Sequence, residues 1–575
     1  MPMSLKNGSR SGRSLLLAMG VNAVFLALAL LIIAPGFESN DDRALAAFVD
    51  GQMAQKSAYI PYINFALAAL LKGVYLLLGD GAAWNTIGQY LLIFAGFTAI
   101  SWTLFSRLRP WQGAVVTLVM LLFFGVDLYT LISYTKTAAV ATVGGLLLML
   151  YVMEYGERGR RALPLALGLL LALFGSMLRF MEFLPCAALT AVLGLRRLWA
   201  LCFDGSLTGR ERLSSVLRYL APFALLAALA AGLYVFDDMM WSRGPFGDYD
   251  EFDAARIELT DYGIPEYKDM PEVYESLDLN ENAAKLYFGW NFFDTEKFDL
   301  DTVRALIAAR NELKPAPSLG ECLGKLLDDC IPRYFINLHI YGFLIMALLW
   351  LATGEHGVRG LLTLLMELGL FAVFYLYLIW RGRYMVDRVD VGLFLAMFAV
   401  LSQTLSAERL EGERTLCALL LLCALGLSVW ISRSSFRFGE HSVMTEDRSG
   451  ERAAVETIVS DEGHLYLAKI DAVSDTLYSP FMTAPAGYAD RIVLLGGWYV
   501  GHPVIADALA KYGVEDPYRD IVGNDRVYII DDDIGVTLRY IRDYYAPDAE
   551  AELVEPLSGE TGLDIYRILA GGEEP

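Results

Sequence analysis

The sequence predicts a polytopic α-helical membrane protein with about 11 transmembrane helices, an external helical segment and a small external α/β domain at the C-terminus. Three observations support this class. The 575 residues are 55% hydrophobic and their mean hydropathy is +0.42, values that few soluble proteins reach. Apolar residues gather in runs of roughly 17–25 residues, the length that crosses a bilayer as a helix. The net charge of −21 comes mainly from two stretches outside those runs.

About eleven runs meet the criterion of length and hydropathy. The first is too long for the apolar core of a signal peptide and is not followed by a small-residue cleavage site, so we expect a retained anchor. The predicted spans are residues 14–35, 84–106, 112–127, 137–153, 162–177, 183–196, 218–236, 334–352, 359–379, 389–404 and 414–432.

Basic residues in the loops predict the orientation in the cell membrane. Lys6, Arg10 and Arg13 precede the first run, and cytoplasmic loops of membrane proteins are enriched in Lys and Arg. The N-terminus is therefore expected in the cytoplasm and, after an odd number of spans, the C-terminus outside. The loops that share the side of the N-terminus contain Arg107 and Arg109, residues 158–161, residues 196–212, His356 to Arg359, and Arg409 to Arg414.

Two domains follow from this pattern. Residues 1–436 are predicted to form the transmembrane domain, with external loops at 36–83 and 237–333. Residues 59–78 are apolar but contain Pro61 and Lys72, which favours a helix at the external interface over a further span. Residues 437–575 alternate strand-like and helix-like patterns and are expected to form an extracytoplasmic α/β domain. The acidic charge of both soluble parts argues against nucleic acid and against anionic lipid surfaces as partners.

The six cysteines predict no metal centre. No Cys or His spacing typical of structural zinc occurs. Cys322 and Cys330 lie in the second external loop. On one continuous helix their eight-residue separation spans about 12 Å of rise, which is too far for a disulfide, so a bridge requires a bend between them.

Asp41 and Asp42 are the main catalytic candidates. They follow the first run, at the external mouth of the expected bundle, where paired charge is costly without a use. A carboxylate there can accept a proton from an acceptor hydroxyl, or the pair can hold a divalent cation such as Mg²⁺ or Mn²⁺. The alternative is that Ser39 or Asn40 caps a helix whose first turn favours acidic residues. The two interpretations are compatible.

Cations at the external ends of the spans are candidates for binding a phosphate, since the positive-inside rule disfavours cations there. The arginine fork can donate two parallel hydrogen bonds to a phosphate. The alternative is snorkelling, or pairing with Glu182 and Asp387. Glu182 and His339 are further site candidates, although a lone histidine is more often a packed residue. The five candidate cations are Lys136, Arg179, Arg381, Arg383 and Arg388.

The stretch from Asn40-Asp41-Asp42 through Tyr59-Ile60-Pro61-Tyr62 to about Phe105 resembles the GT-C class of integral-membrane glycosyltransferases. The chain also looks like a group of bacterial membrane proteins, mainly of Gram-positive lineages, that brings no established activity. The second resemblance rests on Thr135-Lys136-Thr137-Ala138, Asp261-Tyr262-Gly263-Ile264-Pro265, Trp290-Asn291-Phe292, Arg381-Gly382-Arg383 and Tyr512-Gly513-Val514-Glu515-Asp516-Pro517-Tyr518.

The GT-C resemblance implies an enzyme that transfers a sugar from a polyprenyl-phosphate-linked donor to a glycan or lipid acceptor of the cell envelope, outside the cytoplasm. Asp41 or Asp42 would then be the general base or cation ligand, and the external Arg and Lys would hold the lipid phosphate. One alternative is a glycan polymerase or ligase, which would not need the Asp pair. Another is a transporter or flippase of lipid-linked intermediates, expected to show internal repeats and ionisable residues inside the spans. Neither feature is evident in the sequence, where the charges gather at the external rim.

Overall fold

The computed structural model describes residues 8–571 except 54, 157–160, 314–316, 335–336, 356, 384–385, 439–448, 471, 474–477, 483–484 and 486. Most of the basic loop predicted at 158–161, and His356, therefore lie outside the described residues. So does most of the linker that precedes the C-terminal domain.

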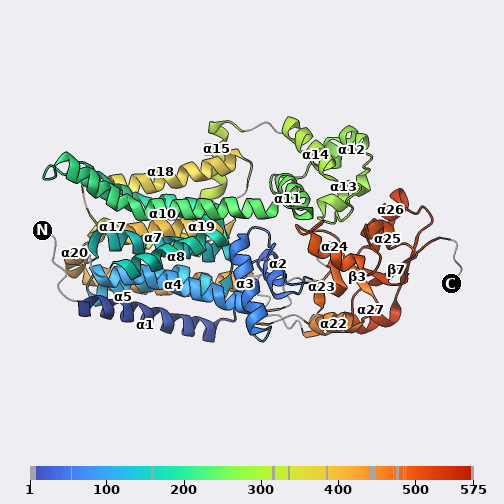
Figure 1. The fold of residues 1–575 in the computed structure, drawn as a ribbon, viewed down its shortest axis with the longest axis horizontal. Helices are drawn as coiled ribbons and strands as arrows, with labels where there is room; N and C mark the ends of the chain where they lie inside the picture. The colour runs from blue at the N-terminus through green and yellow to red at the C-terminus, as the bar shows by residue number, and fades with distance from the viewer. Residues whose placement is uncertain are drawn as a thin grey trace.

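A bundle of long apolar helices forms the first part of the chain (Figure 1). Within the described residues, eight helical segments are long and apolar enough to cross a membrane, which makes the chain a multi-pass membrane protein, as predicted. They are α1 (Gly8–Ile32), α4 (Trp84–Arg107), the segment Pro110–Thr130 with α5 (Pro110–Met120), η1 (Leu121–Gly125) and α6 (Val126–Thr130), α7 (Tyr134–Tyr155), α9 (Phe180–Cys202), α10 (Gly209–Trp241), α18 (Val358–Trp380) and α21 (Arg414–Phe438).

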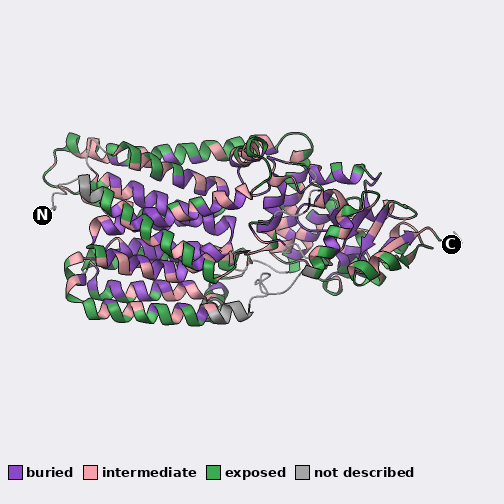
Figure 2. Ribbon diagram, turned by 90° about the horizontal axis from the view of Figure 1, so that it is seen from below, coloured by how far each residue is buried: buried purple, intermediate pink, exposed green. Residues whose placement is uncertain are grey.

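Three of the predicted spans are shorter helices of 16 or 17 residues. They are α8 (Ala162–Leu178), α17 (Leu338–Thr353) and α19 (Asp387–Ser402). A helix of 16 residues is about 24 Å long, below the usual hydrocarbon thickness of about 30 Å. Nearly all of α19 is buried inside the bundle, whereas the outer helices expose leucine along their length (Figure 2).

The segment after α1 crosses one end of the bundle. It contains β1 (Gly36–Phe37), α2 (Asn40–Asp50) and α3 (Phe65–Leu78), and Figure 1 shows α3 running across the bundle axis. β1 pairs in parallel with β2 (Leu131–Ile132), with Gly36 opposite Leu131. This pairing fixes the start of α2 beside the start of α7.

The N-terminus and the C-terminal domain lie at opposite ends of the bundle (Figure 1). Several of the predicted basic loops contact one another: Arg109 Nη1 lies 2.7 Å from Glu411 Oε2, and Arg409 donates to the carbonyl oxygen of Gly354 at 2.7 Å. α20 (Ala407–Gly412), which contains Arg409 and Glu411, lies at the N-terminal end. The basic loops 107–109 and 407–414 are therefore gathered at that end.

The segment between α10 and α17, which the sequence predicts to be external, is helical, as its pattern indicates. Cys322 carries a free, buried thiol. The helix continues from α15 into η3 without the bend that a bridge would require, and the side chain of Cys330 lies outside the described residues. The elements are α11 (Pro245–Asp261), η2 (Tyr267–Asp269), α12 (Pro271–Ser276), α13 (Glu281–Phe288), α14 (Leu300–Leu313), α15 (Leu319–Lys325), η3 (Leu326–Cys330) and α16 (Ile331–Tyr334).

The C-terminal part contains a small mixed α/β sheet, which confirms the predicted class of that domain. The strand order is β4-β3-β5-β7-β6; β3 is parallel to β4 and β5, and β7 is antiparallel to β5 and β6. The elements are α22 (Ser449–Ser460), β3 (Leu465–Ala468), α23 (Tyr488–Arg491), β4 (Ile492–Leu494), α24 (Pro503–Ala510), α25 (Pro517–Asp520), β5 (Val527–Ile530), α26 (Ile534–Tyr544), β6 (Glu550–Leu553), α27 (Glu555–Thr561) and β7 (Ile565–Leu569).

A loop of the external segment fills the carboxyl edge of the parallel strands, where α/β sheets commonly bind ligands. The Ile470 N–H donates to Asn291 Oδ1 at 2.8 Å, and the Phe293 N–H donates to the Leu495 carbonyl oxygen at 2.9 Å. Gly496 lies so close to the Trp290 carbonyl that a Cβ atom there would collide with it. The sheet and residues 290–293 therefore form one packed unit.

His502, the N-cap of α24, lies at the junction between the C-terminal domain and α2. Its ring packs against Phe48 and Tyr249, with ring centroids 4.7 and 4.8 Å away. Nδ1 accepts a hydrogen bond from the Val504 N–H, and Nε2 lies 3.2 Å from the Tyr59 carbonyl oxygen. These partners fit a neutral imidazole with the proton on Nε2. Burial lowers the pKa of His502 to about 3.

We expect His502 to make the folded protein less stable in mild acid. Its folded pKa of about 3 is below the ordinary 6.5, so the unfolded chain takes up the proton first as the pH falls. The contribution of the neutral His502 to the free energy of unfolding is complete above pH 6.5. It decreases by about 1.4 kcal/mol per pH unit as the pH falls toward 3. Asn keeps the N-cap acceptor and does not titrate. Thermal unfolding should therefore show a smaller loss of Tm between pH 7.5 and 5 for His502→Asn than for the wild type. Equal losses would contradict the assignment.

Candidate functional site

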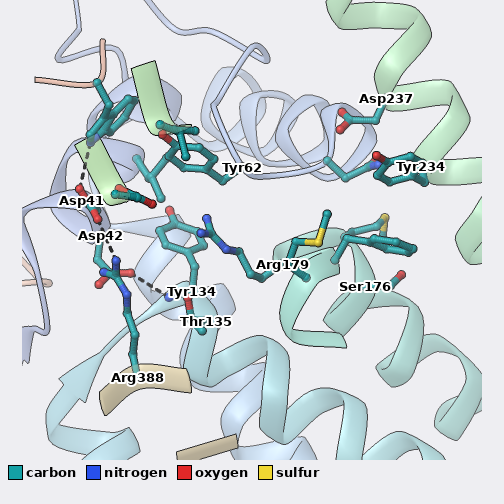
Figure 3. Close-up of a pocket in the computed structure, with 18 of the residues that line it drawn as sticks. Asp41, Asp42, Tyr62, Tyr134, Thr135, Ser176, Arg179, Tyr234, Asp237 and Arg388 are labelled. Atoms are coloured by element: carbon teal, nitrogen blue, oxygen red, sulfur yellow. Dashed lines mark hydrogen bonds and ion pairs between the residues drawn. The ribbon is translucent and has the colours of Figure 1, made fainter. Parts of the chain in front are cut away.

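A cavity of about 450 Å³ lies where the bundle, the external segment and the C-terminal domain meet. Figure 3 shows Asp41, Asp42 and Arg388 gathered at one end, and Tyr234, Asp237 and Ser176 at the other. The polar and aromatic residues that line it are Asp41, Asp42, Tyr62, Asn64, Tyr134, Thr135, Ser176, Arg179, Phe180, Tyr234, Asp237, Arg256, Asp261, Trp290, Arg383, Arg388 and Trp498.

Asp41 is the more accessible of the two predicted catalytic carboxylates, with about a third of its side chain exposed. One oxygen accepts a hydrogen bond from Trp498 Nε1 at 3.0 Å, and the other lies 3.2 Å from Arg388 Nη2. Arg388 also donates to Ser39 Oγ at 2.9 Å. A residue of the C-terminal domain and a residue of α19 thus hold the Asp41 carboxylate from two sides (Figure 3).

Asp42 is buried and serves the local fold. One oxygen accepts the backbone N–H of Tyr134 at 2.9 Å, and the other accepts the Ser39 hydroxyl at 2.8 Å. Ser39 is the N-cap of α2, as one sequence interpretation anticipated, and its oxygen accepts from the Asp42 N–H. Burial raises the pKa of the Asp42 carboxyl, against the opposing effects of Arg388 and the Tyr134 N–H. Asp42 therefore joins the start of α2 to the start of α7.

Arg179 differs from the other cations of the cavity in its lack of an ion-pair partner among the described residues. It is the N-cap residue of α9, at the junction with α8, and its guanidinium lies 4.8 Å from the centre of the Tyr62 ring. Among the described residues, its side chain has no carboxylate partner and no hydrogen-bond acceptor. Burial lowers the pKa of Arg179, and the nearby Arg388 and Arg383 act in the same direction. The geometry leaves guanidinium donors available to an anion in the cavity.

The other arginines of the cavity carry carboxylate partners. Arg383 Nη2 lies 2.6 Å from Asp261 Oδ2 at the rim. Arg256 donates to Asp253 at 2.5 and 2.8 Å and to the Tyr62 hydroxyl at 3.2 Å. These pairs limit the donors that each of them can turn toward a ligand.

Lys136, His339, Glu182 and Arg381 lie outside the cavity lining. Lys136 is buried, with its Nζ 2.9 Å from Glu38 and 2.6 Å from Asp127. His339 Nε2 lies 3.3 Å from the same Asp127, so Lys136 and His339 belong to one buried ionic cluster. A buried cation with two carboxylate partners has a structural explanation that needs no phosphate.

The remaining two have local partners as well. Glu182 is buried in α9, where its carboxylate accepts from Cys186 Sγ at 3.3 Å. The guanidinium of Arg381 lies over the Tyr262 ring, 5.3 Å from its centre. The structure thus brings together Asp41, Asp42, Arg179, Arg383 and Arg388 from the sequence-predicted set.

Sequence reasoning missed several residues of the cavity, notably Arg256, Trp290 and Trp498. Tyr62 and Trp290 have backbone φ angles of 67° and 64°, a region that bulky residues seldom occupy and that is enriched at functional sites. No local pattern reveals such a conformation, or the meeting of Trp498 with Asp41 across more than 450 positions. The one available signal was the density of aromatic residues in the external segment.

One side of the cavity is formed mainly by apolar residues of the bundle. Met177, Phe180 and Met181 come from α8 and α9, and Leu233 and Tyr234 come from α10. Met181 and Tyr234 have exposed side chains, and Asp237 lies beside Tyr234 (Figure 3). The cavity therefore combines a charged end with a largely apolar wall.

The donor set does not fit a divalent cation closely. In the part of the chain that the structure describes, no group of three or more His, Cys, Asp or Glu side chains converges as metal ligands. Asp41 and Asp42 offer two carboxylates, and both Asp42 oxygens already accept hydrogen bonds.

Fold and site together define a multi-pass membrane protein with a mixed-charge cavity between its helical bundle and a C-terminal α/β domain. Comparison of the chain with protein-family models, with curated proteins and with solved structures finds no match.

Proposed function

We propose that this protein is a GT-C-like glycosyltransferase of the bacterial cell envelope. It has about 11 spans, a cytoplasmic N-terminus and an extracytoplasmic C-terminal domain. It transfers a sugar from a polyprenyl-phosphate-linked donor to a glycan or lipid acceptor on the external face of the membrane. The orientation rests on the basic loops at the N-terminal end of the bundle, opposite the cavity.

The observation that carries this proposal is the unpartnered guanidinium of Arg179 in a cavity that also has an apolar wall. A partly buried cation without a carboxylate partner is costly unless a ligand supplies the counter-charge. A lipid phosphate supplies it, and its prenyl chain matches the wall formed by Met177, Met181 and Leu233. A water-soluble sugar phosphate would have no use for that wall.

The arrangement supports transfer by direct displacement. The acceptor hydroxyl oxygen bonds to the anomeric carbon of the donor while the bond from that carbon to the phosphate oxygen breaks. Asp41 takes the hydroxyl proton, and the phosphate leaves with the electron pair. Arg179 donates hydrogen bonds to the phosphate as its charge develops. Tyr62 and Trp290 offer aromatic faces on which a sugar ring can pack.

A specific observation favours a second function, transport of a lipid-linked intermediate. Glu367 lies near the middle of α18, fully buried, and neither of its carboxylate oxygens has a hydrogen-bond partner among the described residues. Glu182 and Asp390 are also buried in the bundle. Ionisable residues are therefore not confined to the external rim, in contrast to the expectation from the sequence. Ionisable residues inside spans are common in proton-coupled transporters.

One experiment separates the two functions. The purified wild type is reconstituted in liposomes with a panel of polyprenyl-phosphate sugars and cell-envelope extract, and products are followed by mass spectrometry. We expect the donor to be consumed and a glycosylated product to form. Movement of intact donor between leaflets without consumption supports transport. If no donor is either consumed or moved between leaflets, both proposals are contradicted.

A further inference from the structure

The helical stretch from Leu319 to Ile331 carries an exposed apolar stripe. Leu319, Leu323, Leu327 and Ile331 recur every four residues, and all four are exposed; Leu319 is 67% and Leu327 is 59% accessible. On an α-helix this spacing drifts by about 40° at each step. The π-helical turn η3 has more residues per turn and counters the drift. The four side chains therefore stay on one side of the stretch.

The other sides of the stretch have clear environments. Cys322 is buried, and Leu326 packs against the apolar core of the bundle. Glu321, Lys325 and Asp328 are exposed on the side away from the leucine stripe. One side thus faces protein and one faces water. The helix is therefore amphipathic, and its leucine stripe has no partner among the described residues.

The position of α15 indicates what covers the stripe. α15 packs against α18, one of the eight candidate spans, and Figure 1 shows it on the outside of the bundle beside that helix. Toward its C-terminal end, α18 exposes Val373, Tyr377 and Trp380. The stripe therefore lies beside an exposed, mainly apolar surface of a candidate span.

We infer that Leu319–Ile331 is an in-plane membrane helix whose leucine stripe lies among the acyl chains of the leaflet on the side of the C-terminal domain. The sequence alone predicts that this stretch belongs to a soluble external loop. α3 provides a precedent at the same end of the bundle: it also runs across the bundle axis (Figure 1) and exposes Leu76, Leu77 and Leu78. The inference is independent of any sugar or phosphate in the cavity.

The first test uses the wild-type protein in phosphatidylcholine nanodiscs that contain a phosphatidylcholine with a diazirine at the acyl terminus. After illumination, adducts are mapped by peptide mass spectrometry. We expect adducts on Leu319–Ile331 at a yield comparable with Val358–Trp380, and none on Pro271–Phe288. A stretch 319–331 that stays unlabelled while α18 is labelled overturns the inference. That result is also the one expected if a second copy of the chain or another protein covers the stripe.

A second measurement resolves the two sides of the helix. In a background with all six cysteines replaced, nitroxide labels are placed at Leu323→Cys and Leu327→Cys, with Glu321→Cys as the matched control. We expect the labels at 323 and 327 to collide more with oxygen than with a polar nickel complex, and the label at 321 to show the reverse. Three labels with the same preference contradict an in-plane helix. The lipid labelling above needs no substitution, so it decides the question even if this background misfolds.

Discussion

Replacing Arg179 with glutamine should weaken binding of a polyprenyl-phosphate donor by about 10- to 100-fold. A hydrogen bond to a charged group contributes about 1.5–3 kcal/mol, and each 1.4 kcal/mol is a factor of ten in Kd. Glutamine keeps much of the length of the side chain and its packing on Tyr62 but removes the charge. Binding is measured by isothermal titration with a polyprenyl phosphate in detergent, with the non-phosphorylated polyprenol as a comparison ligand.

Arg381→Gln is the matched control for this loss. Arg381 is a cation of the neighbouring loop that packs on Tyr262 and lies outside the cavity lining. We expect the Kd of the Arg381→Gln variant for the polyprenyl phosphate to stay within about a factor of two of the wild-type value, since removal of an exposed charge usually has a small effect. Equal weakening by both substitutions would show that general surface charge, and not the guanidinium of Arg179, binds the phosphate.

Asp41→Asn should lower turnover by about 10²- to 10⁴-fold, the usual contribution of a general base, and leave donor binding within a few-fold. Asparagine keeps the hydrogen bond from Trp498 but cannot take up the acceptor proton. Product formation is followed by mass spectrometry, and donor binding by titration. Asp248→Asn, on the exposed surface of α11, should leave both quantities unchanged. Turnover that survives in Asp41→Asn would remove Asp41 from the chemistry.

The same substitution at Asp42 should affect stability and not the chemical step. Its two oxygens accept the Tyr134 N–H and the Ser39 hydroxyl, and asparagine can replace only one of these acceptors. We therefore expect Asp42→Asn to act first on stability, with a lower Tm, and on turnover only in proportion to the folded fraction. The two substitutions thus distinguish a catalytic carboxylate from a structural one.

Much of the fold can be predicted from the sequence because apolar length is a local property. The spans near 84–106 and 359–379 begin and end within two residues of α4 and α18. The predicted span 389–404 has the length of α19 and is displaced from it by two residues, whereas the predicted span 334–352 is longer than α17. The 33-residue α10 extends beyond its apolar run at both ends, where polar residues such as Glu211 and Asp238 are exposed.

The candidate site could be predicted only where charge at a span end was itself unusual. That criterion finds Arg179 and Arg388 in the cavity, and it also selects Lys136, whose two carboxylate partners come from elements that are far apart in the sequence. It cannot find Trp498 or Trp290, which are ordinary aromatic residues until the C-terminal domain folds onto the external segment. Tertiary pairing, and not residue type, decides which cations remain available.

The loop 290–293 at the edge of the C-terminal sheet has a consequence for how the protein is made. Asn291 and Ile470 are 179 positions apart, so a ribosome adding about 5–20 residues per second needs roughly 10–40 s to supply the partner. During that time Trp290 and Phe293 lack the sheet that covers them. The cavity is thus completed only after the C-terminal residues have been synthesised. Its aromatic wall is an expected binding site for a chaperone during biosynthesis.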